Sequence, residues 1–315
     1  MAVEQTNHNA DTSGNSKAIV FARHETFHPR FGWLKKGFDY ASRTLHERAA
    51  IDSGIFLRPD APVRLGVGKN MVRSIRYWCS AFKLLKDDQP TAFGQQLLGQ
   101  EGWDSYLEDP ASLWLLHWKL LEAPNLATAW NFVFNYFHPV EFTAEDLLHQ
   151  LCEYRDRVAP RISESSLRKD VSCILRMYVV QPSSKAQVSE DSLDCPFTAL
   201  GLIHTAGDSR HYMFRVGQKQ GLPPEIVVYA CLQHHARTGS SAKTMPIANL
   251  LYDLGSPGLV FKLTESVLCG DIEAVARRWE QISLSDAAGK LQFSFIGEPL
   301  ELSEAILDGY YRAGR

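Results

Sequence analysis

The feature that most constrains the fold is a succession of segments in which apolar residues recur at steps of three and four. Trp33, Leu34, Phe38, Ala41 and Leu45 follow this spacing, which places them on one face of a helix. The same spacing returns after each break, in MVRSIRYWCSAFKLLK, in TAFGQQLLG, in DPASLWLLHWKLL and in LPPEIVVYACLQHHAR. The sequence therefore predicts a mainly α fold.

Capping residues mark the starts of several of these helices. Asp109 stands directly before Pro110, a pair that is typical of a first helical turn. Thr143 has Asp146 three residues later, which is close to a capping box, and Ser163 begins the next helix. That helix is rich in Ser, Lys and Arg at its start. Two capped helices in succession indicate a helix-turn-helix.

Short alternating segments predict small β hairpins in the last third of the chain. FTALGLIHTAGDSRHYMFRVGQKQG alternates around Phe214, and ISLSDAAGKLQFSFIG has Gly289 at its turn. Helices followed by a two-stranded ribbon are the winged-helix order, with SPGLVFKLTESVL as the recognition helix and Ser256 or Thr264 near its cap. VRLGVGKN, earlier in the chain, is expected to form a strand and a turn.

The 315 residues exceed the usual size of one domain, so two or three domains are expected. The predicted parts are a disordered tail at 1–17, a basic DNA-binding region at 18–88, a helical, helix-turn-helix-like domain at 89–181, a linker at 182–195 and a winged-helix-like domain at 196–315. The six cysteines form no CxxC pair, and no export signal or apolar run of roughly 18 residues is present. We therefore expect a cytoplasmic protein without membrane contact.

Positive charge is concentrated near the N-terminus. Between Arg23 and Lys86, thirteen Lys or Arg residues outnumber five acidic residues, although the whole chain has a net charge of −3. Such an excess is typical of a DNA-binding surface, and the alternative is a basic patch that meets acidic residues of the same chain. The candidate DNA-contacting residues are Arg23, Arg30, Lys35, Lys36, Lys69, Asn70, Arg73 and Arg76.

The segment GVGKN inside this stretch resembles the end of a P-loop. It lacks the earlier glycine and the Ser or Thr after the lysine, which argues against ATP hydrolysis. Gly68 and Lys69 nevertheless open a helix, and a helix N-terminus with a lysine suits one DNA phosphate. The alternative interpretation is an ordinary tight turn.

A cluster of His and Glu lies in the same stretch. His24 and His28 stand four residues apart, and Glu25 follows the first of them. On a helix, both imidazoles would share one face and could hold a divalent metal, Mg or Mn, with Glu25 as general base or further ligand. Pro29 disfavours a helix here, so the alternative is a structural turn. The hypothesis names His24, Glu25 and His28 as metal-binding and catalytic residues.

Several segments resemble the bacterial SspB-type proteins of single-stranded DNA phosphorothioation. The resemblance runs from about Phe21 to the C-terminal hairpin and is most specific in ArgHisGluThrPhe (23–27) and GlyTrpLeuLysLys (32–36). It implies a DNA nickase of an anti-phage modification system, whose partners are a cysteine desulfurase, an ATPase and a pyrophosphatase-type enzyme. The alternative is a non-catalytic DNA-binding subunit that recruits sulfur-transfer enzymes or regulates transcription. A homodimer would suit winged helices that read paired half-sites.

Overall fold

The computed structural model describes residues 19–47, 54–180, 195–207, 210–287 and 289–314. Helices dominate, and the strands form small antiparallel sheets, so the predicted fold class is confirmed. The predicted tail at 1–17 lies outside the described residues, as does the predicted linker at 182–195 apart from its last residue. Within the described part, no helix is long and apolar enough to cross a membrane.

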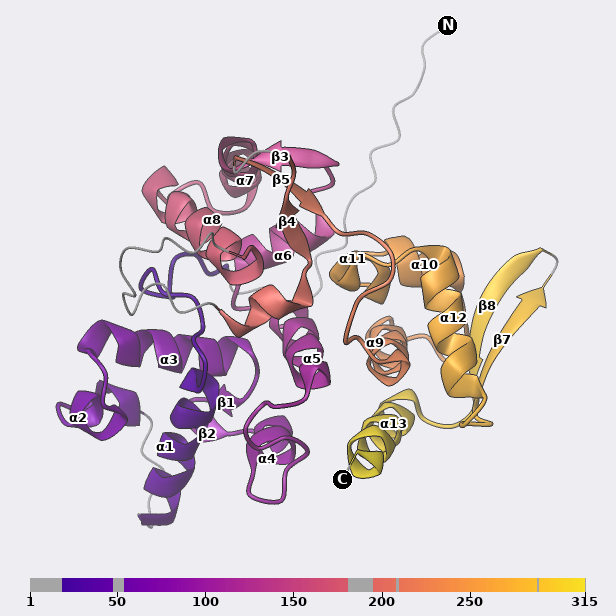
Figure 1. Ribbon diagram of the computed structural model, residues 1–315, viewed down its shortest axis with the longest axis horizontal. Helices are drawn as coiled ribbons and strands as arrows, with labels where there is room; N and C mark the ends of the chain where they lie inside the picture. Colours follow the sequence, from indigo (N-terminus) through magenta and orange to yellow (C-terminus); the bar gives the residue numbers. More distant parts are fainter. Residues whose placement is uncertain (1–18, 48–53, 181–194, 208–209, 288, 315) are drawn as a thin grey trace, which may run out of the picture.

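The N-terminal part is a group of helices around one short hairpin (Figure 1). Its elements are α1 (Trp33–Glu47), η1 (Ile55–Leu57), α2 (Ala61–Leu65), α3 (Lys69–Ala81), β1 (Leu85–Lys86), β2 (Gln89–Pro90), α4 (Ala92–Leu98) and α5 (Pro110–Leu121). α2 stands where the sequence predicted a strand, because Pro62 fits a first helical turn and Gly66 ends the helix at a φ of 64°. α1 and α3 approach closely at Gly37, where a Cβ would lie 2.6 Å from the Sγ of Cys79.

A winged-helix unit follows. Its elements are α6 (Thr128–Asn135), β3 (Glu141–Thr143), α7 (Ala144–Val158), α8 (Glu164–Tyr178), η3 (Pro196–Leu200), β4 (Ile203–Thr205) and β5 (His211–Phe214). The predicted hairpin of β4 and β5 is confirmed, and β5 also pairs with β3, with Phe142 opposite Tyr212. This sheet therefore crosses the predicted boundary at 182–195 and joins the wing to the preceding helices. Three residues of β3 are too few to show an alternating pattern in the sequence.

A second winged-helix unit repeats this order. Its elements are α9 (Pro224–Arg237), β6 (Thr244–Pro246), α10 (Ile247–Tyr252), α11 (Pro257–Phe261), α12 (Glu265–Ala276), β7 (Ile282–Ala287), β8 (Lys290–Phe295) and α13 (Pro299–Ala313). The sheet order β6-β8-β7 matches β3-β5-β4 of the first unit. The predicted recognition helix is two helices, because Lys262 adopts a left-handed φ of 55° and ends α11. Ser256 caps α11, as predicted, by accepting a hydrogen bond from the N–H of Leu259.

One hydrophobic core runs through these parts of the molecule. Four tryptophans lie in it, each at most 1% exposed: Trp78, Trp114, Trp118 and Trp130. His117 of α5 joins both winged-helix units, since its Nδ1 contacts the hydroxyl of Tyr178 at 2.8 Å and its Nε2 the carbonyl of Val260 at 3.0 Å. Burial lowers the pKa of His117 to about 3, so this imidazole is neutral and suits one acceptor and one donor.

Candidate nucleic-acid interface

The helix-turn-helix of the first unit presents α8 as its second helix. α7 begins at the predicted capping box of Thr143 and Asp146, and the hydroxyl of Ser163 caps α8. Leu167, Val171 and Ile174 are buried, which turns the opposite face of α8 outward. The exposed side chains of that face are Glu164, Ser165, Arg168, Lys169 and Ser172. Cations and hydroxyls are the groups that contact DNA backbones, and the second helix of such a motif enters the major groove.

The cations of α8 differ in their partners. Arg168 forms ion pairs with Glu145 at 2.8 Å and with Glu164 at 2.9 Å. Arg176 donates to the carbonyl of Thr26 at 2.7 Å. Lys169 is exposed and forms no ion pair with any described residue. Lys169 is therefore the cation of this helix that is most available to a phosphate.

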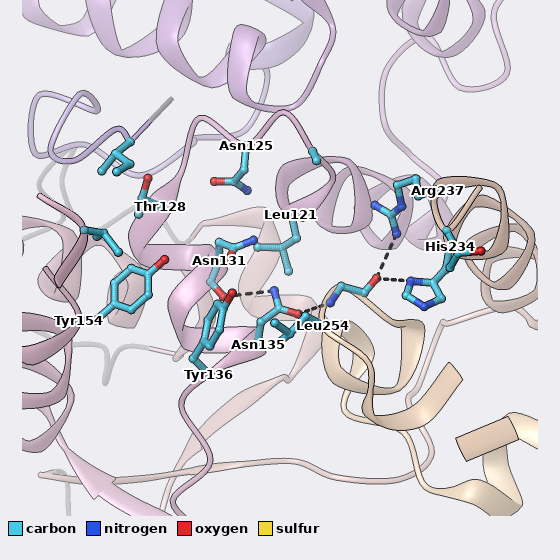
Figure 2. Close-up of a pocket in the computed structure, with 15 residues that line it drawn as sticks. Leu121, Asn125, Thr128, Asn131, Asn135, Tyr136, Tyr154, His234, Arg237 and Leu254 are labelled. Atoms are coloured by element: carbon cyan, nitrogen blue, oxygen red, sulfur yellow. Dashed lines mark hydrogen bonds between the residues drawn. The ribbon is translucent and has the colours of Figure 1, made fainter. Parts of the chain in front are cut away.

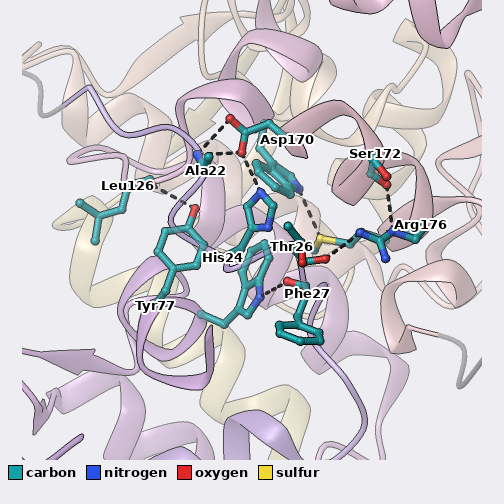
Figure 3. Close-up of polar contacts among 12 residues, drawn as sticks. Ala22, His24, Thr26, Phe27, Tyr77, Leu126, Asp170, Ser172 and Arg176 are labelled. Atoms are coloured by element: carbon teal, nitrogen blue, oxygen red, sulfur yellow. Dashed lines mark hydrogen bonds and ion pairs between the residues drawn. The ribbon is translucent and has the colours of Figure 1, made fainter. Parts of the chain in front are cut away.

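The segment that carries the predicted His and Glu cluster is a turn, and it is bound to α8 (Figure 3). His24 is fully buried, and its Nε2 contacts Oδ1 of Asp170 at 2.9 Å. The backbone N–H of Ala22 donates to the same carboxylate at 3.0 Å. Ala22, Glu25 and Thr26 have φ values of 53°, 50° and 68°, a conformation that such residues adopt only where surrounding contacts impose it.

Burial and hydrogen bonding act in opposite directions on the carboxyl group of Asp170. Burial raises the pKa of Asp170, while the hydrogen bond from His24 acts in the opposite direction. His24 also packs against the aromatic core, with its ring 5.7 Å from Trp130 and 6.2 Å from Trp78. The pair of His24 and Asp170 thus fixes the turn to α8 from inside, and it directs the neighbouring Arg23 outward.

Beside this turn lies a cleft of about 480 Å³, which we call the Arg23 cleft. Its lining includes three of the predicted DNA-contacting residues, Arg23, Arg73 and Arg76. Carboxylates share the cleft: Arg76 pairs with Asp88 at 2.6 Å, and Arg73 lies 3.8 Å from Glu25. The second oxygen of Asp88 is buried and has no hydrogen-bond partner among the described residues.

The other predicted DNA-contacting residues lie elsewhere. Lys69 and Asn70 are exposed at the start of α3, beside Gly68, and so fit the predicted helix N-terminus. Lys36 is exposed on α1, whereas Lys35 pairs with Asp39 at 2.8 Å. These residues line two further concavities, so the predicted set is spread over one part of the molecule.

Arg30 differs from the rest of the predicted set. It is 8% exposed, and its guanidinium lies over the rings of Phe27 and Trp33 at 5.5 and 5.2 Å. A guanidinium over aromatic rings is attracted to them and contributes to packing. The structure therefore gives Arg30 a packing role.

The three predicted metal ligands lie in different surroundings. His24 contacts Asp170, His28 is 6% exposed, and Glu25 lines the Arg23 cleft. Among the residues that the structure describes, no group of three or more His, Cys, Asp or Glu side chains could hold a metal ion. The physical reason is the turn at 22–26, which replaces the helix on which His24 and His28 would share a face.

The second winged-helix unit has a different charge. α12 stands in the place of the recognition helix, and it carries Glu265, Asp271 and Glu273 but no Lys or Arg. Acidic side chains repel phosphates, so this helix is a poor DNA reader. The exposed face of α8 in the first unit therefore carries cations that α12 lacks.

Sequence reasoning named neither Lys169 nor Asp170. The signal for Lys169 was present, because the start of the second capped helix is rich in Ser, Lys and Arg. No signal marked Asp170, since its contact with His24 joins residues 146 positions apart.

Comparisons with known proteins agree with this architecture. The family described as a protein of unknown function, DUF4007, matches residues 21–311. A crystal structure of SspB with bound magnesium is 37% identical, covers 93% of this chain and 88% of its own, and superposes with a TM-score of 0.83. A second SspB crystal structure is 38% identical over the same shares of the two chains, with a TM-score of 0.82. A search of curated proteins found no match. The chain therefore belongs to the DUF4007 family and is an SspB-type protein.

Proposed function

We propose that this SspB-type protein binds DNA as a component of a bacterial phosphorothioation system that acts in anti-phage defence. The observation that carries the proposal is the contact of His24 with Asp170. This contact attaches the turn that carries the exposed Arg23 to α8, which carries the exposed Lys169. A sulfur-transfer system of this kind would supply the cysteine desulfurase, the ATPase and the pyrophosphatase-type enzyme as partners.

DNA binding is tested by measuring affinity against salt concentration. Lys169→Ala and Arg23→Ala should each weaken binding to duplex DNA and reduce the slope of log K against log salt by about 0.9, the value for one lost phosphate contact. Arg312→Ala is the matched control, because Arg312 is 77% exposed on α13 and pairs with Asp308. Unchanged slopes in both variants would contradict the proposed surface.

Strand nicking is the second candidate function. The Arg23 cleft favours it, because carboxylates of Glu25, Asp87 and Asp88 stand among guanidinium groups there. Of the three residues in the sequence hypothesis, Glu25 alone faces this cleft. A related SspB was solved with magnesium. Supercoiled plasmid should therefore be incubated with magnesium, with manganese and with chelator.

The nicking assay separates the two candidates. Conversion of plasmid to open circles by the wild-type protein, lost in Glu25→Gln, would support nicking at the Arg23 cleft. Equal conversion by Glu25→Gln would reject this site. No conversion under any condition, with the plasmid still bound, would leave a non-catalytic DNA-binding subunit that recruits sulfur-transfer enzymes.

A further inference from the structure

A cavity of about 390 Å³ lies between the two winged-helix units, away from the Arg23 cleft. α6 and α7 of the first unit form one side, and α9 and the loop before α11 form the other (Figure 2). Pockets of this size at the junction of two units are the usual places for small ligands. The proposed function makes no use of this cavity.

Part of the cavity wall is rigid. Asn135 accepts a hydrogen bond from the N–H of Gly255 at 2.7 Å, and so joins α6 to the second unit. Asn125 uses both ends of its amide, donating to Leu120 and accepting from Ala127, each at 2.8 Å. These amides are occupied within the protein, so they shape the cavity and leave recognition to other groups.

Two other side chains in the wall have polar atoms without a hydrogen-bond partner among the described residues. The side-chain amide of Asn131 makes no hydrogen bond with a described residue. His234 is 5% exposed, and its Nδ1 contacts the carbonyl of Gly255 at 3.2 Å, so Nδ1 carries the proton. Its Nε2 is then an acceptor, and this buried atom lacks a partner among the described residues. Burial lowers the pKa of His234, which keeps the ring neutral.

Charge and aromatic surface define the ligand. Tyr136 and Tyr154 stand at one end of the cavity with ring centroids 5.5 Å apart, and Arg237 stands at the other. The guanidinium of Arg237 lies 4.8 Å from the ring of Trp118 and donates to the carbonyl of Gly255 at 3.0 Å. No Asp or Glu is among the residues that line the cavity, and Arg237 forms no ion pair with a described residue. The cavity is therefore suited to a planar ring that carries an anionic group.

We propose that this cavity binds a nucleotide, with the base towards Tyr136 and Tyr154 and the phosphate towards Arg237. Aromatic rings stack on bases of any sequence, and an Asn amide can pair with a base edge. The same chemistry is presented by a free nucleotide and by a nucleotide turned out of a DNA strand. Binding of a free nucleotide does not require the DNA surface of α8.

Calorimetric titration of the full chain with deoxyadenosine monophosphate and with deoxyadenosine tests the proposal. The monophosphate should bind about tenfold more tightly, because a charged hydrogen bond to phosphate is worth that factor. Arg237→Ala should lower its affinity to that of the nucleoside and leave nucleoside binding unchanged. Asn131→Ala should lower the affinity for both ligands equally. The near-isosteric Asn131→Asp adds a negative charge and should lower the affinity for the monophosphate more than that for the nucleoside.

Arg277→Ala, an exposed arginine of the same unit, is the matched control and should bind both ligands as wild type does. A single-stranded oligonucleotide distinguishes the two sources of the ligand. If the Asn131 and Arg237 variants weaken binding of the oligonucleotide only, the cavity binds a nucleotide within a strand. If the mononucleotide binds and the oligonucleotide does not, the cavity binds a free nucleotide.

The proposal is overturned if the variants, melting at the wild-type temperature, bind the mononucleotide and the oligonucleotide no differently from the wild type at concentrations up to about 1 mM. Loss of duplex binding in Lys169→Ala, with mononucleotide binding intact, would separate this site from the proposed DNA surface.

Discussion

Replacing Asp170 with alanine tests whether a buried contact holds the N-terminal turn against α8. The residue is 1% exposed and accepts hydrogen bonds from the Nε2–H of His24 and the backbone N–H of Ala22, at 2.9 and 3.0 Å. Removing the carboxylate leaves the buried donor of His24 and the partly buried donor of Ala22 without this acceptor, and an unsatisfied buried donor costs about 1–3 kcal/mol. We expect the free energy of unfolding to fall by about 3 kcal/mol in total. Asp170→Asn keeps one acceptor oxygen and should cost less.

Urea denaturation followed by tryptophan fluorescence measures this change. Hydrogen exchange at the amides of residues 19–30 should accelerate more than exchange elsewhere, because the turn loses its attachment first. On the proposed function, DNA affinity should fall as well, since the turn that carries Arg23 is no longer attached to α8.

Asp156→Ala is the matched control for this variant. Its carboxylate is 63% exposed and pairs with Arg155, so its removal should change stability by less than about 0.5 kcal/mol. Equal effects of the Asp170 and Asp156 variants, together with unchanged exchange at residues 19–30, would refute the reasoning.

Two further perturbations test the packing. Gly94→Ala would place a Cβ 2.3 Å from the carbonyl oxygen of Leu84 and should lower the free energy of unfolding by about 1–3 kcal/mol. At Gly270 a Cβ would meet no atom within 4 Å, so Gly270→Ala should stabilise α12 by up to about 1 kcal/mol. Thermal melts in which Gly94→Ala is the more stable variant would contradict this expectation. Burial lowers the pKa of Lys262 from the ordinary 10.5 to about 7. Between these values the unfolded chain binds more protons than the native chain, so the free energy of unfolding rises with pH. Urea titrations between pH 7 and 10.5 should show that Lys262→Met loses most of this rise. If its free energy of unfolding rises with pH as steeply as that of the wild type, Lys262 is not the cause.

The sequence alone determined the local structure of this protein. Apolar spacing predicted α1, α3 and α5, and capping residues such as Thr143 and Ser163 marked where α7 and α8 begin. These features depend on residues a few positions apart, so they can be identified in one sequence. The sequence also showed where positive charge is concentrated, and the wing hairpins followed from alternation and from Gly289.

Only the tertiary structure decided which of these residues share a surface. A pattern of His24, Glu25 and His28 does not reveal that His24 will meet Asp170, 146 residues away, and leave the solvent. The pairing of β3 with β5 and the cavity between the two winged-helix units likewise join segments that are distant in the chain. Such contacts form because burial of the whole core selects one arrangement of helices, and that selection is a property of the packed molecule. Local spacing therefore specifies the elements, while burial decides which side chains remain at the surface.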